Sequence, residues 1–310
     1  MCYSGQVVAQ WREFQRRTGA AIAIRDFLDL FVFRSQDPRV KIPKAMEADF
    51  LRGEPLGDEE REIRALIEAW AARQITETEQ ELFRQRKRLA DAQRVLQTGK
   101  PTKAAAEHAR IATNKVEWCL GRLADLKRSE LKDKDSRIFP GWYVPVMVME
   151  GGRRVIRPMR YQCRPAGKPA SYDSKFPGTY NARRDNLEGF WKGLFGRSHA
   201  IMIAKRFYEN VQRDGGNVVL EFTPRTGQDM WVACLWSRWS APGERDLLSF
   251  AAITDEPPPE VAAAGHDRCI IPIKPEHADA WLNPDSKDLA AQYAILDDRE
   301  RPYYEHRLAA

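Results

Sequence analysis

The chain has 310 residues, of which 43% are hydrophobic and 30% charged, a balance typical of a folded globular protein and not of a disordered one. Its formal net charge of +6 favours an anionic partner, with nucleic acid the first choice. The five cysteines form no C-x-x-C pair, which argues against a disulfide framework or a zinc site and for a reducing cytoplasm. We expect no signal peptide, no membrane span, no metal and no organic cofactor.

The N-terminal part of the chain, residues 5–35, predicts two short amphipathic helices separated by Thr18-Gly19. Its aromatic side chains, such as Trp11 and Phe27, are expected in the core and not at a ligand. Residues 41–44 are expected to form a loop.

Residues 58–134 predict an antiparallel helical hairpin. Apolar residues recur every seven positions in its first helix, which keeps one face against a partner helix: Ile75, Leu82, Leu89 and Leu96. Thr102 is suited to cap the second helix. A basic cluster lies in the first helix: Arg84, Arg86, Lys87, Arg88 and Arg94. Two interpretations stay open for this cluster, a solvated helix face and a DNA-contacting arm.

After Pro140 the pattern changes to short strands. A β-hairpin is predicted at residues 143–156, with its turn at Gly151-Gly152. Further strands are expected at residues 200–204, 218–222, 230–236, 247–254 and 270–273, and helical pieces at 187–195, 276–282 and 287–293. This pattern predicts an α+β fold, an antiparallel, barrel-like β-sheet core with peripheral helices and the inserted helical hairpin.

The second residue of the chain carries distinctive chemistry. Once Met1 is removed, Cys2 has a free α-amine and a thiol on adjacent carbons, groups whose reference pKa values are about 8 and 8.5. Such a 1,2-aminothiol condenses with an aldehyde to an imine, which the sulfur closes into a thiazolidine. The alternative is an incidental thiol near the start of the chain.

Three further motifs accompany Cys2: Asn181-Ala182-Arg183 after a Gly-Thr-Tyr turn, Phe207-Tyr208-Glu209 at the end of the strand 200–204, and His266-Asp267-Arg268 before another apolar strand. In this order they resemble the SOS response-associated peptidase (SRAP) family, and Pro272 and Trp281-Leu282 fit the segment that follows. The resemblance covers the start of the chain and residues 140–284. It implies a single SRAP-like domain over residues 1–310, with 58–134 inserted beyond the compact family core.

The chain departs from the family pattern in segments that concern strand binding. Tyr3-Ser4 stands where family members often have Gly-Arg, so any DNA contact from that Arg is missing. Asn210 stands in place of the usual Trp after Phe-Tyr-Glu, which removes a possible stacking platform. These departures leave the covalent chemistry intact.

The resemblance implies four catalytic residues. Cys2 would be the nucleophile, and Glu209 would shuttle protons while the sugar ring opens. His266 would protonate the sugar oxygen or hold a phosphate, and Asn181 would orient the Cys2 amine. The alternatives are a solvated Glu at a strand end, a structural His that caps its loop, and an Asn in a turn.

DNA contacts are expected from guanidinium groups, which match phosphate oxygens bidentately. Arg183 and Arg268 are the first candidates, and the basic track would extend through Arg184, Arg160 and Lys168. Tyr3 or Trp142 would stack on a base, and the sequence does not choose between them.

The resemblance therefore implies a cytoplasmic protein, nucleoid-associated if bacterial, that senses abasic sites in single-stranded DNA. It would cross-link to them through Cys2, shield the lesion, and release Met1 as a cysteine autopeptidase, with an associated lyase activity possible. Two alternatives stay open, a non-covalent nucleic-acid-binding protein that uses the basic hairpin and a cysteine peptidase that acts in trans. Protein partners are unknown.

Overall fold

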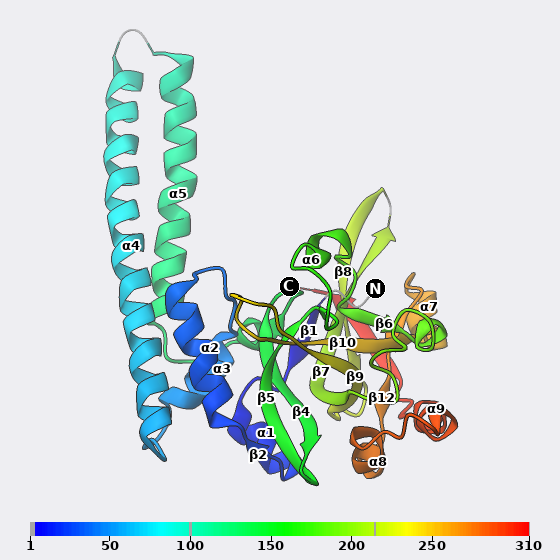
Figure 1. Cartoon of the computed structure of the whole chain (residues 1–310). Helices are drawn as coiled ribbons and strands as arrows, with labels where there is room; N and C mark the ends of the chain where they lie inside the picture. Colours follow the sequence, from blue (N-terminus) through cyan, green and yellow to red (C-terminus); the bar gives the residue numbers. More distant parts are fainter. Residues whose placement is uncertain (1–3, 99–100, 214, 310) are drawn as a thin grey trace. The chain divides into compact units, whose positions relative to one another are not determined.

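The computed structural model describes residues 4–98, 101–213 and 215–309. The chain forms two compact units: one combines the residues up to Pro55 with those from Lys132 onward, and the other is Leu56–Leu131. The first unit is α+β, and the second is a pair of long helices (Figure 1). None of the helices in the described residues is long and apolar enough to cross a membrane. The expectation of a single domain over residues 1–310 stays a prediction.

The first unit contains all the strands of the described residues and the shorter helices. Its strands are β1 (Ser4–Val7), β2 (Ala21–Ile22), β3 (Arg137–Ile138), β4 (Tyr143–Glu150), β5 (Arg153–Tyr161), β6 (Asn181–Arg183), β7 (His199–Arg213), β8 (Gly216–Pro224), β9 (Met230–Trp239), β10 (Leu247–Asp255), β11 (Cys269–Ile270), β12 (Pro272–Ile273) and β13 (Tyr304–Leu308). Its helices are α1 (Trp11–Thr18), α2 (Ile24–Gln36), α3 (Lys44–Leu51), α6 (Tyr172–Lys175), α7 (Pro259–Ala263), α8 (Ala278–Leu282) and α9 (Leu289–Asp297).

The thirteen strands of the described residues belong to one mixed sheet. Its main path runs β12-β9-β10-β5-β4-β7-β1-β3, and β7 also pairs with β9. Most pairs are antiparallel, but β10 runs parallel to both β5 and β6, and β2 runs parallel to β5. The expectation of an antiparallel sheet is therefore wrong in part, because long connections allow distant strands to pair in the same direction. The barrel-like detail stays a prediction.

The central strand is β7, which pairs with β1, β4, β8 and β9. Its apolar run at residues 200–204 is fully buried, as expected, but the strand continues to Arg213. Phe207 stacks on Phe222 of β8 with ring centroids 5.0 Å apart. Phe207-Tyr208-Glu209 thus lies inside a strand and not at its end.

The aromatic residues of the N-terminal helices form a core, as predicted. Phe50 of α3 lies within 6 Å of three other rings, with centroid distances of 5.9 Å to Trp11, 5.6 Å to Phe27 and 5.5 Å to Phe31. The helix α1 ends at Gly19, whose φ of 68° is left-handed and whose N–H bonds to the Gln15 carbonyl. Burial of these rings holds α1, α2 and α3 together.

Local turn signals predicted one connection correctly and another incorrectly. β4 and β5 form the expected hairpin, with Gly151 and Gly152 both at positive φ. The helix expected at residues 187–195 is absent, and that segment is a series of turns after a short 3-10 helix at Arg184–Asn186. Gly189 and Gly193 interrupt it, and glycine disfavours a regular helix.

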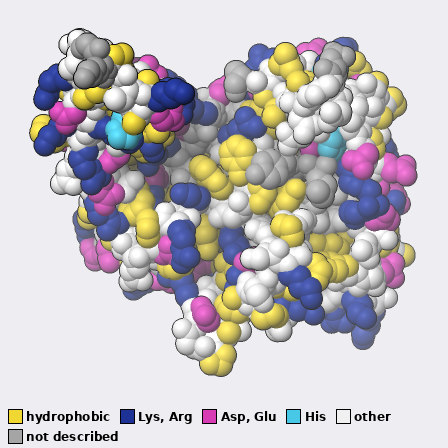
Figure 2. Space-filling view, turned by 90° about the horizontal axis from the view of Figure 1, so that it is seen from above, with side chains coloured by type: hydrophobic (Ala, Val, Ile, Leu, Met, Phe, Trp, Pro, Cys, Tyr) yellow, Lys and Arg dark blue, Asp and Glu magenta, His cyan; other side chains and the backbone are white. Residues whose placement is uncertain are grey.

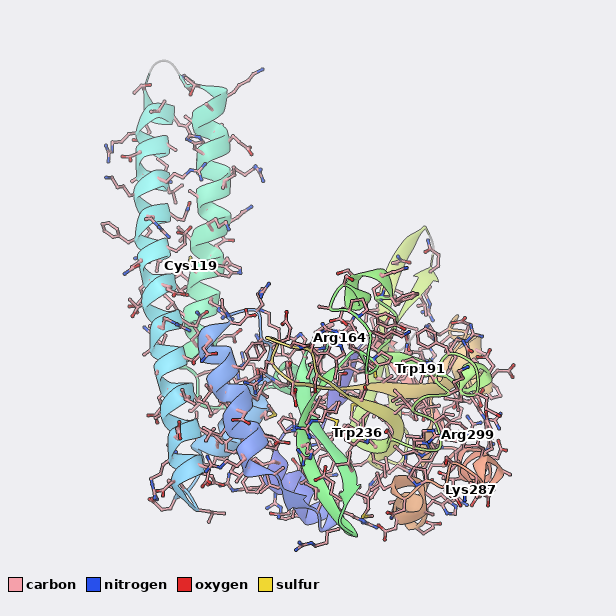
Figure 3. The ribbon with its side chains drawn as sticks, in the orientation of Figure 1. Cys119, Arg164, Trp191, Trp236, Lys287 and Arg299 are labelled. Carbon is pink, nitrogen blue, oxygen red and sulfur yellow. The ribbon has the colours of Figure 1, made fainter. Side chains whose placement is uncertain are left out.

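The second unit consists of α4 (Asp58–Gln97) and α5 (Lys103–Lys127), which lie side by side and run in opposite directions (Figure 1). Its core contains Leu82, Cys119 and Leu123, with Ile75 and Val116 packed against them. Figure 3 shows Cys119 between the two helices. The Thr102 side chain caps α5 by accepting the N–H of Ala105 at 3.1 Å, as predicted.

Candidate active site

A buried carboxylate and a buried imidazole meet at the centre of the candidate site. Glu209 on β7 is fully buried, and His266 in the loop between α7 and β11 is 8% exposed. His266 Nε2 lies 3.0 Å from Glu209 Oε2. Burying a carboxylate is costly unless it has a partner, and the imidazole lies within ion-pair distance of one of its oxygens.

The loop around His266 holds the ring in place. Its Nδ1 lies 2.8 Å from the Arg268 carbonyl oxygen, and the Arg268 N–H points at the same nitrogen from 3.3 Å. Gly265 immediately before it has a φ of +99°, which a side chain would strain. Backbone groups thus bind one imidazole nitrogen, and the other is directed at Glu209.

The first described residue of the chain lies beside this pair in the sheet. β1 pairs antiparallel with β7, so that Ser4 is opposite Tyr208 and Gly5 opposite Phe207. Glu209 is therefore the next residue of β7 beyond the pairing partner of Ser4. Cys2 and Tyr3 lie outside the described residues.

Asn181 begins β6 and is 7% exposed. Neither its side-chain oxygen nor its nitrogen has a hydrogen-bond partner among the described residues. A buried amide without a partner is costly, at about 1–3 kcal/mol, so it is uncommon in a folded protein unless it has another role. The strand β10 connects this residue to the His266 loop, because Thr254 is paired with Arg183 of β6 on one side and Ile270 of β11 on the other.

The chain matches a known protein family. The model of the SOS response associated peptidase (SRAP) family matches residues 72–308. The chain belongs to the SRAP family. The family description associates this SRAP chain with a peptidase and with the SOS response.

Three solved structures resemble the SRAP chain. A protein from Bordetella bronchiseptica is 19% identical, with 56% of this chain and 87% of that chain covered and a TM-score of 0.47. A protein from Bacteroides thetaiotaomicron is 13% identical, with 56% and 78% covered and a TM-score of 0.48. A phage-related protein from B. bronchiseptica is 19% identical, with 59% and 85% covered and a TM-score of 0.44. No curated protein matches the chain.

Arg183 and Arg268 lie in one charged group of the SRAP chain with Asp185 and Asp267. Arg183 donates to both oxygens of Asp185, at 3.0 and 2.5 Å, and its side chain is 50% exposed. The hydrogen bond to Asp185 raises the pKa of Arg183, and the charges of Asp185 and Asp267 add to this effect. Arg268 is 3.9 Å from Asp267 and only 15% exposed. Arg183 is the more accessible of the two cations.

The other expected DNA contacts are engaged within the protein. Arg160 binds Asp173 at 2.8 Å, and Asp173 also accepts from Arg164, which is labelled in Figure 3. Arg184 binds Asp297 at 2.5 Å and lies 5.5 Å from the ring centre of Tyr293. A strand phosphate would have to compete with these carboxylates.

One cation near the start of the chain was missed by the sequence analysis. Arg137 of β3 donates to the Ser4 hydroxyl from Nη2 at 3.1 Å and from Nε at 3.3 Å. Its guanidinium lies 3.8 Å from the ring centre of Tyr208, close enough for a cation–π contact. Only the pairing of β1 with β3, which joins residues more than a hundred positions apart, brings it here. No local signal in the sequence could have found it.

The four cysteines in the described part of this SRAP protein are poor nucleophiles. Cys119, Cys163, Cys234 and Cys269 are all free and buried. Burial raises the pKa of Cys163 to about 12 and raises the pKa of Cys234 and Cys269 further above the usual range. Since the thiolate is the reactive form, these thiols are inert at neutral pH.

Proposed function

We propose that this SRAP protein recognises abasic sites in single-stranded DNA and traps them covalently through Cys2. The proposal depends mainly on the register of β1 on β7. This register places Ser4, the first described residue, opposite Tyr208, which is next to Glu209 of the Glu209–His266 pair. Two residues of chain span at most about 7 Å. This short span supports a role for position 2 in the chemistry of the buried acid–base pair.

The proposed chemistry needs no redox step. The sugar of an abasic site opens to an aldehyde, and the neutral Cys2 amine adds to its carbonyl carbon. Loss of one water molecule produces the imine, and the thiolate then adds to the imine carbon to close a thiazolidine. The nitrogen takes up the proton that the thiol gave, so the overall change is the loss of one water.

Glu209 and His266 are proposed to move the protons of this sequence. Ring opening removes a proton from the sugar hydroxyl and delivers one to the ring oxygen, and loss of water needs a proton on the departing hydroxyl. The buried pair can hold a proton between its two members at 3.0 Å. The unpartnered amide of Asn181 has one acceptor and two donor hydrogens available for the Cys2 amine or the new ring.

Met1 must leave before the amine of Cys2 is free. Either the protein itself or an aminopeptidase hydrolyses the Met1–Cys2 peptide bond. The first route is the sense in which this protein would be a cysteine autopeptidase. Recognition of the strand is proposed to use Arg183 and Arg268, supported by Arg184 and Arg160, through phosphates and not bases.

The test is covalent capture under denaturing conditions. The untagged protein, with Met1 removed, is incubated with a single-stranded oligonucleotide that contains one abasic site. The product is analysed by denaturing electrophoresis and intact mass. We expect an adduct whose mass is the sum of protein and oligonucleotide less one water. Cys2→Ser should form only an imine, which becomes stable after borohydride reduction.

Protein with a blocked Cys2 amine distinguishes thiazolidine formation from attack by the thiol alone. Protein whose Cys2 amine is blocked by acetylation keeps its sulfur, and we expect it to form no stable adduct. A stable adduct from a fully blocked amine would overturn the mechanism. Failure of the unblocked protein to form any adduct, together with turnover of a peptide in trans, would support the cysteine peptidase instead.

A further inference from the structure

The positive charge of the protein is concentrated at one end of the helical hairpin. The chain has 50 Lys and Arg and 44 Asp and Glu, and residues 84–115 contain nine of the former against two of the latter. The rest of the chain is therefore slightly acidic. Figure 2 shows Lys and Arg side chains gathered on the hairpin as seen from above.

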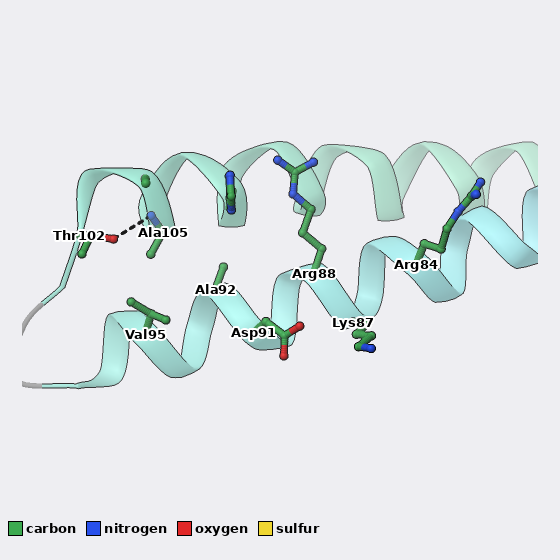
Figure 4. Close-up of a pocket in the computed structure, with 10 residues that line it drawn as sticks. Arg84, Lys87, Arg88, Asp91, Ala92, Val95, Thr102 and Ala105 are labelled. Atoms are coloured by element: carbon green, nitrogen blue, oxygen red, sulfur yellow. Dashed lines mark hydrogen bonds between the residues drawn. The ribbon is translucent and has the colours of Figure 1, made fainter.

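The way the two helices pack leaves these long side chains uncovered. Farther from the α4–α5 connection, the interface between the helices contains Leu82, Cys119 and Leu123. Toward the connecting end, the buried residues are the small Ala92, Ala105 and Ala112. Alanines let the helices approach closely but do not cover their flanks. An open pocket of about 480 Å³ lies there, and its lining includes Arg84, Lys87, Arg88 and His108 (Figure 4).

Within the basic cluster, some cations are paired and others are not. Arg84 binds Glu81 at 2.5 Å, Arg94 binds Asp91 at 3.0 Å and Arg110 binds Glu107 at 2.6 Å. No carboxylate of the described residues forms an ion pair with Arg86, Lys87 or Arg88, which are consecutive in α4. We call these three residues the unpaired triplet. Arg88 extends from α4 toward α5 in Figure 4.

The hairpin also carries an exposed aromatic ring. Trp118 of α5 is 58% exposed, and Lys115 Nζ lies 5.8 Å from its ring centre. Unpaired guanidinium groups and an exposed ring beside a cation are what a nucleic-acid strand requires, since phosphates bind the cations and bases stack on aromatic faces. An acidic protein surface would bind the cations but would leave the exposed Trp118 ring without a stacking partner.

We propose that the end of the hairpin is a nucleic-acid contact in its own right, at which the unpaired triplet binds backbone phosphates. This inference rests on the proposed function in that both assign DNA as the partner. It adds a second binding surface in the unit Leu56–Leu131, separate from the acid–base pair. Its contribution is to affinity and to the salt dependence of binding, and it plays no part in the covalent step.

The test measures non-covalent binding to DNA that contains no abasic site, so that the covalent step cannot contribute. The full chain and the variant R86Q/K87Q/R88Q are compared by fluorescence anisotropy over a range of salt concentrations, with a single-stranded and a duplex oligonucleotide. For the single strand, loss of three phosphate contacts should reduce the slope of log K against log salt by about 2. The affinity at about 100 mM salt should fall roughly tenfold or more.

Two matched variants make the result specific. R61Q/R122Q/K127Q removes the same charge from the hairpin at cations that have partners, since Arg61 binds Asp58, Arg122 binds Gln74 and Lys127 binds Glu79. It should bind nearly as the wild type does. R86K/R88K keeps the charge and should keep the salt slope. Circular dichroism at 222 nm checks that all variants remain helical.

The outcomes separate this proposal from the proposed function. A loss with only one of the two oligonucleotides identifies the form of DNA that the triplet binds. Wild-type affinity and slope in the triplet variant with both oligonucleotides would overturn the proposal, as would an equal loss in R61Q/R122Q/K127Q. Cross-linking to saturating abasic strand should proceed at the wild-type rate in the triplet variant. Absence of cross-linking in the wild-type protein would count against the proposed function, but not against this second binding surface.

Discussion

His266 Nε2 lies 3.0 Å from Glu209 Oε2, and the two residues come from distant segments, the central strand and the loop before β11. Both are buried, and backbone groups of Arg268 bind the second imidazole nitrogen. As the proposed proton shuttle, this pair should affect the rate of cross-linking more than the binding of a strand.

Glu209→Gln should slow cross-linking by about 10²-fold or more, because the amide keeps the shape but cannot exchange a proton. Binding to an undamaged strand should barely change. Single-turnover cross-linking and anisotropy measure the two effects. Glu47→Gln, which changes a partly buried partner of Arg34 in the α3 helix, serves as a control. A Glu209→Gln variant with the wild-type rate would make this carboxyl structural.

Asn181→Leu should make the protein more stable and less active. The apolar side chain removes a buried amide that has no partner among the described residues, so the free energy of unfolding should rise by about 1 kcal/mol. The midpoint of thermal unfolding should rise by a few degrees, and cross-linking should slow. Thermal unfolding and cross-linking are measured on the same preparation. Lower stability would show that the amide is satisfied in the folded protein.

Arg183→Gln should weaken binding to any strand, whatever its base sequence. A half-exposed guanidinium that binds phosphate releases one counterion, so the slope of log K against log salt should fall by about 0.7. Arg268→Gln is the companion variant. Anisotropy with two unrelated sequences distinguishes phosphate binding from base reading, and a sequence-dependent loss would contradict the assignment.

Arg137 contacts both Ser4 and Tyr208, and Arg137→Lys tests whether it positions the start of the chain or binds phosphate. Lysine keeps the charge but not the two-point bond to the Ser4 hydroxyl, so cross-linking should slow while strand binding stays near the wild-type value. Arg137→Met should slow cross-linking as well. Full activity in the lysine variant, with loss in the methionine variant, would instead assign Arg137 to phosphate binding.

His199 should make the fold sensitive to mild acid. Its Nδ1–H donates to the Trp281 carbonyl at 3.0 Å, its Nε2 accepts the Gly196 N–H at 2.8 Å, and burial lowers its pKa to about 3. Between pH 6.5 and 3 the unfolded chain binds a proton here that the folded chain excludes, so stability is full above pH 6.5 and decreases as the pH falls. At pH 5 the loss is about 2 kcal/mol.

Thermal unfolding at pH 7 and pH 5 measures this loss, with His199→Gln as the comparison. The variant should be less stable at pH 7, because the ring that it removes stacks on Trp281 with centroids 3.9 Å apart. The difference between its two midpoints should nevertheless be smaller than in the wild type. An equal difference would assign the acid sensitivity to other groups.

Much of the fold could be predicted where the signals are local. The seven-residue repeat of Ile75 and Leu82 and the cap at Thr102 predicted the α4–α5 hairpin, and Gly151-Gly152 predicted the β4–β5 turn. These features depend on neighbours within a few positions. The parallel pairing of β10 with β5 and β6 depends on contacts between distant segments, and no periodicity reports them.

The residues of the candidate site were likewise predicted from short motifs. The burial of Glu209, its closeness to His266 and the unpartnered state of Asn181, however, all depend on distant strands. Glu209 was expected at a strand end because the apolar run stops at Ala204. The strand continues because β8 pairs with residues 207–213 and supplies their hydrogen bonds.

The pairing of β1 with β7 also determines when the site can exist during synthesis. The start of the chain leaves the ribosome first, but its strand partner begins only at His199, which at up to 20 residues per second is about 10 s later. A bare aminothiol would meet free aldehydes of the cell throughout that interval. Under the proposed mechanism, Met1 would protect the amine while it stays attached. We expect nascent chains stalled before residue 199 to retain Met1 when the cell's aminopeptidase is inhibited, and full-length chains to lose it, which mass spectrometry can read directly.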